Sequence, residues 1–191
     1  MGVEMIVKPR WQPSVEVDNV WVTSDEHYHH ANSIRYDRRP FSSVDEMNRE
    51  MVRRHNEVVG DDDLVIHAGD FSMAGRQQAQ NIISRLKGTH WFLEGSHDKW
   101  NKAQKPPQRL ELAIEGQWVI VDHYCMFTWP KSHYNSCLLF GHSHNDRIYA
   151  GKQLNVGVMN NNYYPFSWQQ IVDIMETRKD NPNLVRKRKP S

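Results

Sequence analysis

Short apolar runs that end abruptly at aspartate or histidine are the feature that most constrains this chain. The polar residues at their ends are Asp25 and His27, Asp70, Ser96 with His97 and Asp98, His123, and His142 with His144. A run of four to eight apolar residues is typical of a buried strand. The loops at the carboxyl ends of strands in an α/β sheet converge on a ligand. The sequence therefore predicts that five loops meet at one place.

Helices are predicted between these runs. In "SSVDEMNREMVRRHNEVVG" (42–60), apolar residues recur at helical spacing, Ser43 with Glu46 forms a capping signature, and Gly60 closes the segment. Residues 76–88 predict a second amphipathic helix, and Ser167 caps a last one at 167–178. The order strand, helix, strand, helix, strand makes the first half of an α/β chain.

The second half of the chain predicts antiparallel pairs. Residues 110–124 predict a hairpin that turns near Glu115 and Gly116, and residues 147–158 predict a hairpin about Gly151. Together with the first half, this pattern predicts two mixed sheets packed face to face with helices outside.

Length and composition predict one domain, at residues 1–178, because 38% of the 191 residues are hydrophobic. Residues 179–191, which contain "VRKRK", predict a basic, flexible C-terminal tail. The structural interpretation of these residues is a solvated tail, and the functional alternative is an auxiliary contact to a phosphate backbone.

Whole-chain charge and hydropathy favour no class of macromolecular partner. The 24 Lys and Arg residues nearly cancel the 23 Asp and Glu residues, so the whole-chain charge does not favour nucleic acid or membrane. No signal peptide and no membrane span is predicted, which indicates a cytoplasmic protein without a membrane partner. Cys125 and Cys137 form no CxxC motif, and their apolar contexts predict buried thiols.

The mixture of carboxylate and imidazole predicts a metal centre. Taken singly, each motif has a structural explanation as a helix cap, a turn or a solvated loop. Taken together, imidazole and carboxylate suit Mn, Fe or Zn, whereas Ca and Mg prefer oxygen ligands. The candidates are too many for one closed tetrahedral zinc site. Two ions bridged by a carboxylate account for them better, and such pairs are typical of hydrolytic phosphoesterases.

The ordered motifs D-x-H (25–27), G-D (69–70), G-x-H-D (95–98), a lone His123 and G-H-x-H (141–144) resemble those of the calcineurin-like metallophosphoesterase superfamily. The stretches "SDEHYHHANSIRYDRRPFSSVDEMN" and "DHYCMFTWP" resemble its small, uncapped bacterial and phage members. The resemblance runs from about residue 20 to about residue 170. It implies an α/β fold, a four-layer α/β/β/α sandwich of two mixed sheets flanked by helices.

The resemblance also implies a role for each motif. Asp25, His27 and His144 would hold a first metal ion, Asp70 would bridge, and His123 and His142 would hold a second. The cofactors would be two divalent ions, Mn first, with Fe, Zn, Ni and Mg as alternatives. A hydroxide that bridges them would be the nucleophile. His97 would protonate the leaving oxygen or stabilise charge, with Asp98 orienting its imidazole.

Three residues need separate interpretation. The superfamily places asparagine where this chain has Ser96, so a shorter and poorer ligand predicts a weaker second metal site. His30 aligns with a histidine of the small members and is a candidate phosphate contact. Arg39 is a candidate phosphate clamp because guanidinium offers paired donors, and its alternative is a surface arginine before a proline.

The predicted function is a metal-dependent phosphoesterase that hydrolyses phosphodiesters, either nucleotide-type or small phosphate esters. One alternative is a nuclease acting on single-stranded nucleic acid. The other is a binding scaffold that keeps the fold with an eroded site, and Ser96 is the residue that favours it. The expected partner is therefore a phosphate ester, with nucleic acid as the alternative. The sequence leaves the oligomeric state open.

Overall fold

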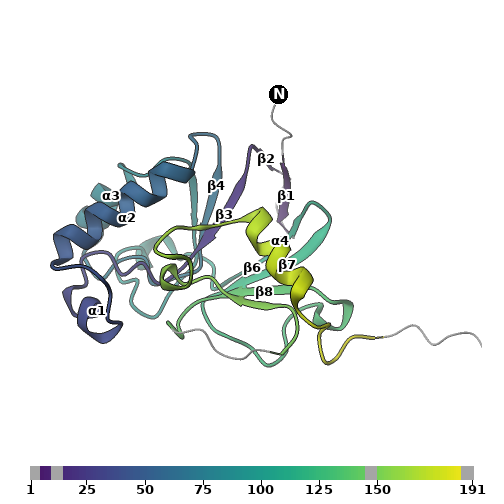
Figure 1. Ribbon diagram of the computed structural model, residues 1–191. Coiled ribbons are helices and arrows are strands. Elements are labelled where there is room, and N and C mark those ends of the chain that lie inside the picture. Colours follow the sequence, from purple (N-terminus) through teal and green to yellow (C-terminus); the bar gives the residue numbers. More distant parts are fainter. Residues whose placement is uncertain (1–4, 10–14, 145–149, 186–191) are drawn as a thin grey trace, which may run out of the picture.

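The computed structural model describes residues 5–9, 15–144 and 150–185, which form two mixed β-sheets and four α-helices (Figure 1). The six-stranded sheet has the order β2 (Val15–Val17), β1 (Met5–Pro9), β6 (Arg109–Ile114), β7 (Gln117–Asp122), β8 (Cys137–Phe140), β9 (Gln153–Asn155). The four-stranded sheet has the order β10 (Phe166–Ser167), β3 (Val20–Thr23), β4 (Leu64–His67), β5 (Thr89–Phe92). The helices are α1 (Ala31–Tyr36), α2 (Val44–Val58), α3 (Arg76–Ile83) and α4 (Trp168–Thr177). Mixed α/β architecture with two mixed sheets is thus confirmed.

The two sheets pack against each other through one apolar cluster. Val22 and Ile66 from the four-stranded sheet meet Ile114, Val121 and Leu139 from the six-stranded sheet, and all five are fully buried. Each such side chain contributes about 1.5–3 kcal/mol when it is removed from water. In the four-stranded sheet, β3, β4 and β5 run parallel, so their carboxyl ends lie at the same sheet edge.

Helices α2 and α3 cover the outer face of the four-stranded sheet and lie side by side beyond β4 (Figure 1). Their apolar faces, which include Met47, Met51 and Ile82, pack around Phe71. The predicted start of α2 is confirmed, because Ser43 Oγ accepts a hydrogen bond from the Glu46 amide.

The outer face of the six-stranded sheet differs from the sequence expectation. It is covered by Trp129, which packs on Ile120 and Phe140, within the loop that joins β7 to β8. In the described part of the chain, α4 packs into the inter-sheet cluster instead of on this face. Pro130 follows Trp129, and Lys131 next to it is left-handed, so the β7–β8 connection cannot continue as an α-helix.

The hairpin predicted at 110–124 is confirmed, whereas the one predicted at 147–158 lies partly outside the described residues. Strands β6 and β7 pair antiparallel around Glu115 and Gly116, whose positive φ values of 47° and 79° suit a tight two-residue turn. Strand β9, in contrast, pairs in parallel with β8. Residues 147–149, which make up most of the first half of the hairpin predicted at 147–158, lie outside the described residues.

The packed chain continues past the boundary predicted at residue 178. Asn181 is buried, and its side-chain amide donates hydrogen bonds of 3.0 and 2.9 Å to the carbonyl oxygens of Ser132 and Ser136. The basic residues 186–189 of the predicted tail lie outside the described residues. Cys137 is buried as expected, but Cys125 is exposed because it lies on the irregular β7–β8 loop. None of the described helices is both long enough and apolar enough to cross a membrane.

Three histidines form a buried ring cluster between α2 and the four-stranded sheet. The His67 ring stacks on Phe92 at 4.5 Å and lies tilted, 5.2 Å from the His90 ring, and the His55 ring lies 5.5 Å from that of His90. His55 Nε2 donates to the Lys87 carbonyl oxygen at 2.9 Å. Burial lowers the pKa of His55 to about 4 and the pKa values of His67 and His90 to about 3. The three imidazoles are therefore neutral at pH 7.

We expect these histidines to make the fold acid-sensitive. Below its ordinary pKa of 6.5, His55 binds a proton in the unfolded chain, whereas in the folded chain it does so only near pH 4. Its stabilising contribution is thus complete above pH 6.5 and is lost as the pH falls, by about 1.4 kcal/mol per pH unit. His55→Leu should reduce the pH slope of the free energy of unfolding, measured by urea denaturation between pH 7 and pH 5. Met51→Leu in the same helix should leave the slope unchanged, and an unchanged slope in His55→Leu would contradict the assignment.

Candidate metal centre

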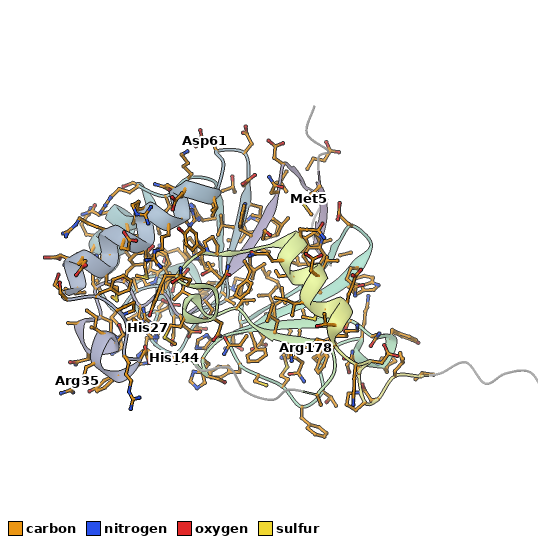
Figure 2. The ribbon with its side chains drawn as sticks, in the orientation of Figure 1. Met5, His27, Arg35, Asp61, His144 and Arg178 are labelled. Carbon is orange, nitrogen blue, oxygen red and sulfur yellow. The ribbon has the colours of Figure 1, made fainter. Side chains whose placement is uncertain are left out.

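The structure brings the predicted ligands together at the carboxyl ends of the strands. They form two groups whose ligand atoms lie within 4.8 Å of one another. The first group is Asp25, His27 and His144, and the second is Asp70, His123 and His142. These groups come from the loops that follow β3, β4, β7 and β8. Figure 2 shows His27 and His144 next to each other, and their Nε2 atoms lie 3.2 Å apart.

Asp70 lies between the two groups. Its Oδ2 atom is 3.3 Å from His123 Nε2 and 3.8 Å from His27 Nε2, so one carboxylate oxygen faces a histidine of each group. Asp25 Oδ1 lies 3.7 Å from His144 Nε2. This geometry is compatible with two adjacent cations that share the Asp70 carboxylate.

The backbone of the candidate ligands is strained. Asp25, His27, Asp70, His142 and His144 all have positive φ values, between 52° and 65°. Few residues other than glycine adopt this left-handed conformation, which costs about 1–3 kcal/mol each. Such residues cluster at functional sites, because only there is the strained side-chain direction useful. Positive φ also occurs in turns elsewhere in the described chain, for example at Glu115 and Lys131, so backbone conformation supports the motif assignment but does not by itself identify the ligands.

Glycines allow the loops to approach closely. A Cβ atom at Gly95 would collide with the backbone nitrogen of Asp70, and one at Gly141 would collide with Ser24 Oγ. Gly69 combines a φ of 94° with a hypothetical Cβ only 2.7 Å from the His123 ring. Gly69, Gly95 and Gly141, which open three of the motifs, are thus required by the packing of one loop against the next.

Charge in the centre is concentrated on Asp70. Burial alone would raise its pKa, but the His123 imidazole and the His97 amide, which donates to Oδ1 at 2.7 Å, together hold the pKa well below its usual range. For Asp25, burial dominates and raises the pKa to about 6. Burial also lowers the pKa of His27 to about 3, so its imidazole is neutral. Burial would lower the pKa of His123, but the Asp70 carboxylate outweighs burial and raises it, and the hydrogen bond to Asp37 raises the pKa of His144. A metal ion bound by these two imidazoles would therefore displace their protons.

Hydrogen bonds made by Nδ1 leave the Nε2 atoms of His123 and His144 directed toward the carboxylates of the centre. His123 Nδ1 donates to the Ala68 carbonyl oxygen at 2.9 Å, while its Nε2, facing Asp70, is buried without a hydrogen-bond partner. His144 Nδ1 lies 2.8 Å from Asp37 Oδ1, so its Nε2 points at Asp25. Burying a nitrogen lone pair that accepts no hydrogen bond costs free energy, unless a cation binds to that nitrogen. The residues present therefore fit a divalent metal.

Asp37 is a functional candidate that the sequence did not predict. Its carboxylate fixes the His144 ring, and the His144 imidazole lowers the pKa of Asp37 although burial opposes this. Carboxylates that orient ligating histidines are common around metal sites. Asp37 lies one residue after α1 and matches no spacing rule, so only the tertiary structure could identify it.

Ser96 and His97 are exposed at the front of the centre. Ser96 Oγ donates to Asp70 Oδ2 at 3.0 Å, which places the hydroxyl on the carboxylate expected to bridge. The His97 ring lies 5.4 Å from that of His27 and 6.2 Å from that of His30. His30 is half-buried, and its buried Nδ1 has no hydrogen-bond partner. These side chains face the same opening as the ligands.

Asp98 does not orient the His97 imidazole, which corrects the sequence prediction. Its buried carboxylate accepts hydrogen bonds from the amides of Asp70 (2.7 Å), Gly95 (3.1 Å) and Ser72 (3.2 Å) and from Trp100 Nε1 (2.9 Å). Neighbouring side chains on this turn point in opposite directions, so His97 faces solvent and Asp98 faces the protein. Asp98 thus links the loop after β4 to the loop after β5 through hydrogen bonds.

Arg39 is not a phosphate clamp, which corrects a second prediction. The residue is 3% exposed, and its guanidinium donates to the carbonyl oxygens of Glu26 at 2.7 Å and Asp25 at 2.9 Å. Its Nε also donates to Asp37 at 3.2 Å. The alternative interpretation, a surface arginine before a proline, is wrong as well, because the guanidinium is buried against the ligand loop.

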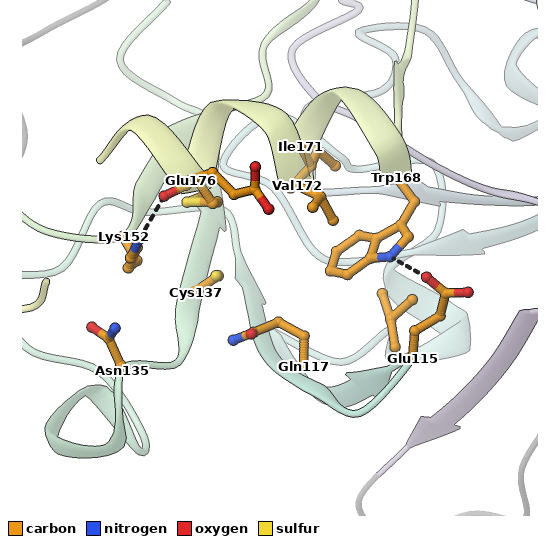
Figure 3. A pocket seen from close by; sticks show the side chains of 11 residues that line it. Glu115, Gln117, Asn135, Cys137, Lys152, Trp168, Ile171, Val172 and Glu176 are labelled. Carbon is orange, nitrogen blue, oxygen red and sulfur yellow. Dashed lines mark hydrogen bonds between the residues drawn. The ribbon is translucent and has the colours of Figure 1, made fainter. Parts of the chain in front are cut away.

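A separate pocket of about 360 Å³ lies between α4 and the six-stranded sheet (Figure 3). Trp168 Nε1 donates to Glu115 at 3.2 Å on one wall, and Lys152 Nζ donates to the Met175 carbonyl oxygen at 2.6 Å on another. None of the candidate metal ligands lines it. The pocket therefore belongs to the packing of α4 and not to the metal centre.

Comparison with known proteins places the chain in a family. No protein-family profile matches it. It is 30% identical over 173 residues to the uncharacterized protein MJ1445 of Methanocaldococcus jannaschii, a match that covers 84% of this chain and 93% of that protein. The chain belongs to the family of MJ1445.

The fold is similar to that of a solved structure. The crystal structure of AQ665 from Aquifex aeolicus, a protein of unknown function, matches with a TM-score of 0.67 at 21% sequence identity. The match covers 82% of this chain and 98% of that chain. Since the sequence identity is low, this likeness concerns the fold alone.

The hydrogen bonds of Asp98 predict a role in stability. In Asp98→Asn, an amide NH₂ would face backbone N–H donors, and we expect the free energy of unfolding to fall by about 2 kcal/mol or more. His97→Ala, one residue earlier, should leave it unchanged because that side chain is exposed. Urea denaturation of the two variants measures the difference. Equal stability of Asp98→Asn and the unmodified protein would contradict the assignment.

Proposed function

We propose that the protein is a metal-dependent phosphoesterase that hydrolyses phosphodiesters. The observation that carries the proposal is the pair of three-residue groups with the Asp70 carboxylate between them. A mixture of imidazole and carboxylate ligands suits Mn or a similar transition metal. Two divalent ions in this position would acidify a bound water and neutralise charge on a phosphate ester.

The residues of the centre have separate roles in this proposal, in metal binding, in ligand orientation and in proton transfer. Asp25, His27 and His144 would hold one ion, His123 and His142 would hold the other, and the Asp70 carboxylate faces a histidine of each group. Asp37 keeps the His144 ring in place, and the carbonyl oxygen of Ala68 does the same for His123. The exposed His97 imidazole is in position to give a proton to the leaving oxygen of an ester bound at the front of the centre. His30 contributes a second imidazole on the same side.

The order of the sequence motifs supports a more specific fold assignment. We infer that the two sheets form the sandwich of the calcineurin-like metallophosphoesterases, in a small and uncapped form. Two observations support this: the motifs fall at the carboxyl ends of the strands, and α2 and α3 cover one outer face. The irregular covering of the other face, by Trp129, would be this family's own variation.

Hydrolysis of bis(p-nitrophenyl) phosphate by metal-stripped protein titrated with Mn²⁺ tests the proposal. We expect a rate that depends on Mn²⁺ and falls about 10²–10⁴-fold in His97→Ala, because a general acid contributes that much. Metal content, measured by plasma emission, should stay the same in this variant. His133→Ala, which removes an exposed histidine on the β7–β8 connection, is the control and should retain the rate. A rate that stays at the buffer baseline across the titration would refute the proposal.

Ser96 predicts unequal metal sites. Because its hydroxyl is short and hydrogen-bonded to Asp70, we expect the second Mn²⁺ ion to bind more weakly than the first. Ser96→Asn would supply an amide oxygen and should tighten the weaker site by about 10-fold, the lower end of the range for one supporting group. Ser96→Ala is the control, since it removes the hydroxyl without adding a ligand. Isothermal titration with Mn²⁺ measures both sites, and two tight, equal sites in the unmodified protein would contradict the prediction.

A further inference from the structure

Two aromatic side chains stand in solvent beside the candidate centre. The Tyr124 ring lies 4.9 Å from the His123 ring and 4.7 Å from the His142 ring, and Tyr124 is 47% exposed. Phe127, three residues further on, is 97% exposed. A phenylalanine exposed to this extent contributes little to folding, because its ring has almost no contact with the protein.

The neighbours of Phe127 place it at the metal end of the sheet. Arg109 Nη2 lies 3.2 Å from the sulfur of Met126, and Arg109 Nε donates to Asp122 at 2.9 Å. Asp122 is the last residue of β7, directly before His123. Four residues span at most about 14 Å, so Phe127 lies within the length of a nucleotide or two from the metal ligands.

The segment that carries these rings is anchored at both ends. The Tyr124 amide donates to Asp122 at 2.9 Å, and Trp129 is buried against the six-stranded sheet. Tyr124 and Phe127 are thus held toward solvent by buried neighbours on each side. Tyr134 is also exposed, but it lies three residues before β8, whose first residue pairs with Val119 near the opposite end of β7.

Exposed cations lie on two segments that directly follow residues of the centre. Arg35 and Arg38 are exposed on the segment that follows His30, and Lys99 and Lys102 are exposed on the segment that follows Asp98. Residues 99–108 contain no acidic residue, and the one acid of residues 31–43, Asp37, is engaged by His144 and Arg39. The whole chain carries a net charge of only +1, so these positive charges are a local excess.

We propose that the substrate of this centre is single-stranded nucleic acid, with a base stacked on Phe127 and the backbone phosphates held by these cations. The proposal rests on the phosphodiesterase function and names its substrate class. Exposed aromatic rings combined with a positive groove are the features that bind single strands without sequence preference. A duplex would keep its bases stacked inside and could not use the ring.

Fluorescence anisotropy of a labelled oligothymidylate of about 12 nucleotides, a length within known site sizes, tests the proposal. The protein is the Mn²⁺-loaded full chain with His97→Ala, which limits cleavage during the measurement. Adding Phe127→Ala should weaken binding at least about 5-fold, the smallest effect expected for one stacked base. Tyr134→Ala is the matched control and should bind as before. An oligonucleotide of the same length with abasic sugars should not respond to Phe127→Ala.

The salt dependence tests the cations separately. Lys99→Gln should reduce the slope of log affinity against log salt concentration by about 0.7, the value for one phosphate contact of a single strand. Lys87→Gln changes an exposed lysine just before β5, at the other end of that strand, and should leave the slope unchanged.

Three results would overturn the inference: no binding of the oligonucleotide, equal binding of the abasic strand, or equal effects of Phe127→Ala and Tyr134→Ala. Failure of the phosphodiesterase proposal is a different result. In that case the unmodified protein would bind the strand through Phe127 but would hydrolyse neither the strand nor bis(p-nitrophenyl) phosphate. Hydrolysis of the small ester without Phe127-dependent binding would retain the enzyme and refute nucleic acid as its substrate.

Discussion

The contacts of Asp70 are the interaction on which the rest of the centre depends. Its amide donates to Asp98, its carbonyl oxygen accepts from the His27 amide at 3.0 Å, and its carboxylate accepts from Ser96 and from the His97 amide. One residue therefore fixes the positions of three loops. Because these are backbone and carboxylate hydrogen bonds in a buried place, each is stronger than it would be in water.

The centre is strained, and the sheets beneath it make that strain tolerable. Five candidate ligands are left-handed, at a cost of order 1–3 kcal/mol each, so their loops would relax if they stood alone. They do not stand alone, because β4 is fully buried between α2 and the six-stranded sheet and β3 is buried except at Trp21. The guanidinium of Arg39 holds the carbonyl oxygens of Asp25 and Glu26 from below. The packing of the strands thus compensates for the backbone strain of the ligand loops.

The loop 25–27 is buried on one side, whereas the centre on its other side is exposed to solvent. Glu26, between Asp25 and His27, points away from the metal groups, and its Oε1 lies 2.6 Å from His67 Nδ1 in the buried histidine cluster. Burial raises the pKa of Glu26 to about 8, so this acid is not an additional charge competing with Asp25 and Asp70 at neutral pH. On the other side, His97, His142 and Phe127 face solvent. The centre is buried on one side and exposed to solvent on the other, which is compatible with the proposed action on a long substrate.

The sequence by itself indicated the alternation from β3 to β5, the β6–β7 hairpin, α4, the five polar loops and the six candidate ligands, because short apolar runs and glycine-linked motifs are local signals. It did not indicate β1, β2 or α1. It could not determine which way a side chain turns once the loops meet. Asp98 and Arg39 were expected at the substrate but serve the backbone, and Asp37 was not expected at all but orients His144. Their partners are distant in sequence or are backbone groups, which carry no sequence signal. Only the tertiary structure decided these contacts, since hydrogen bonds between loops form after the strands have brought the loops to one edge.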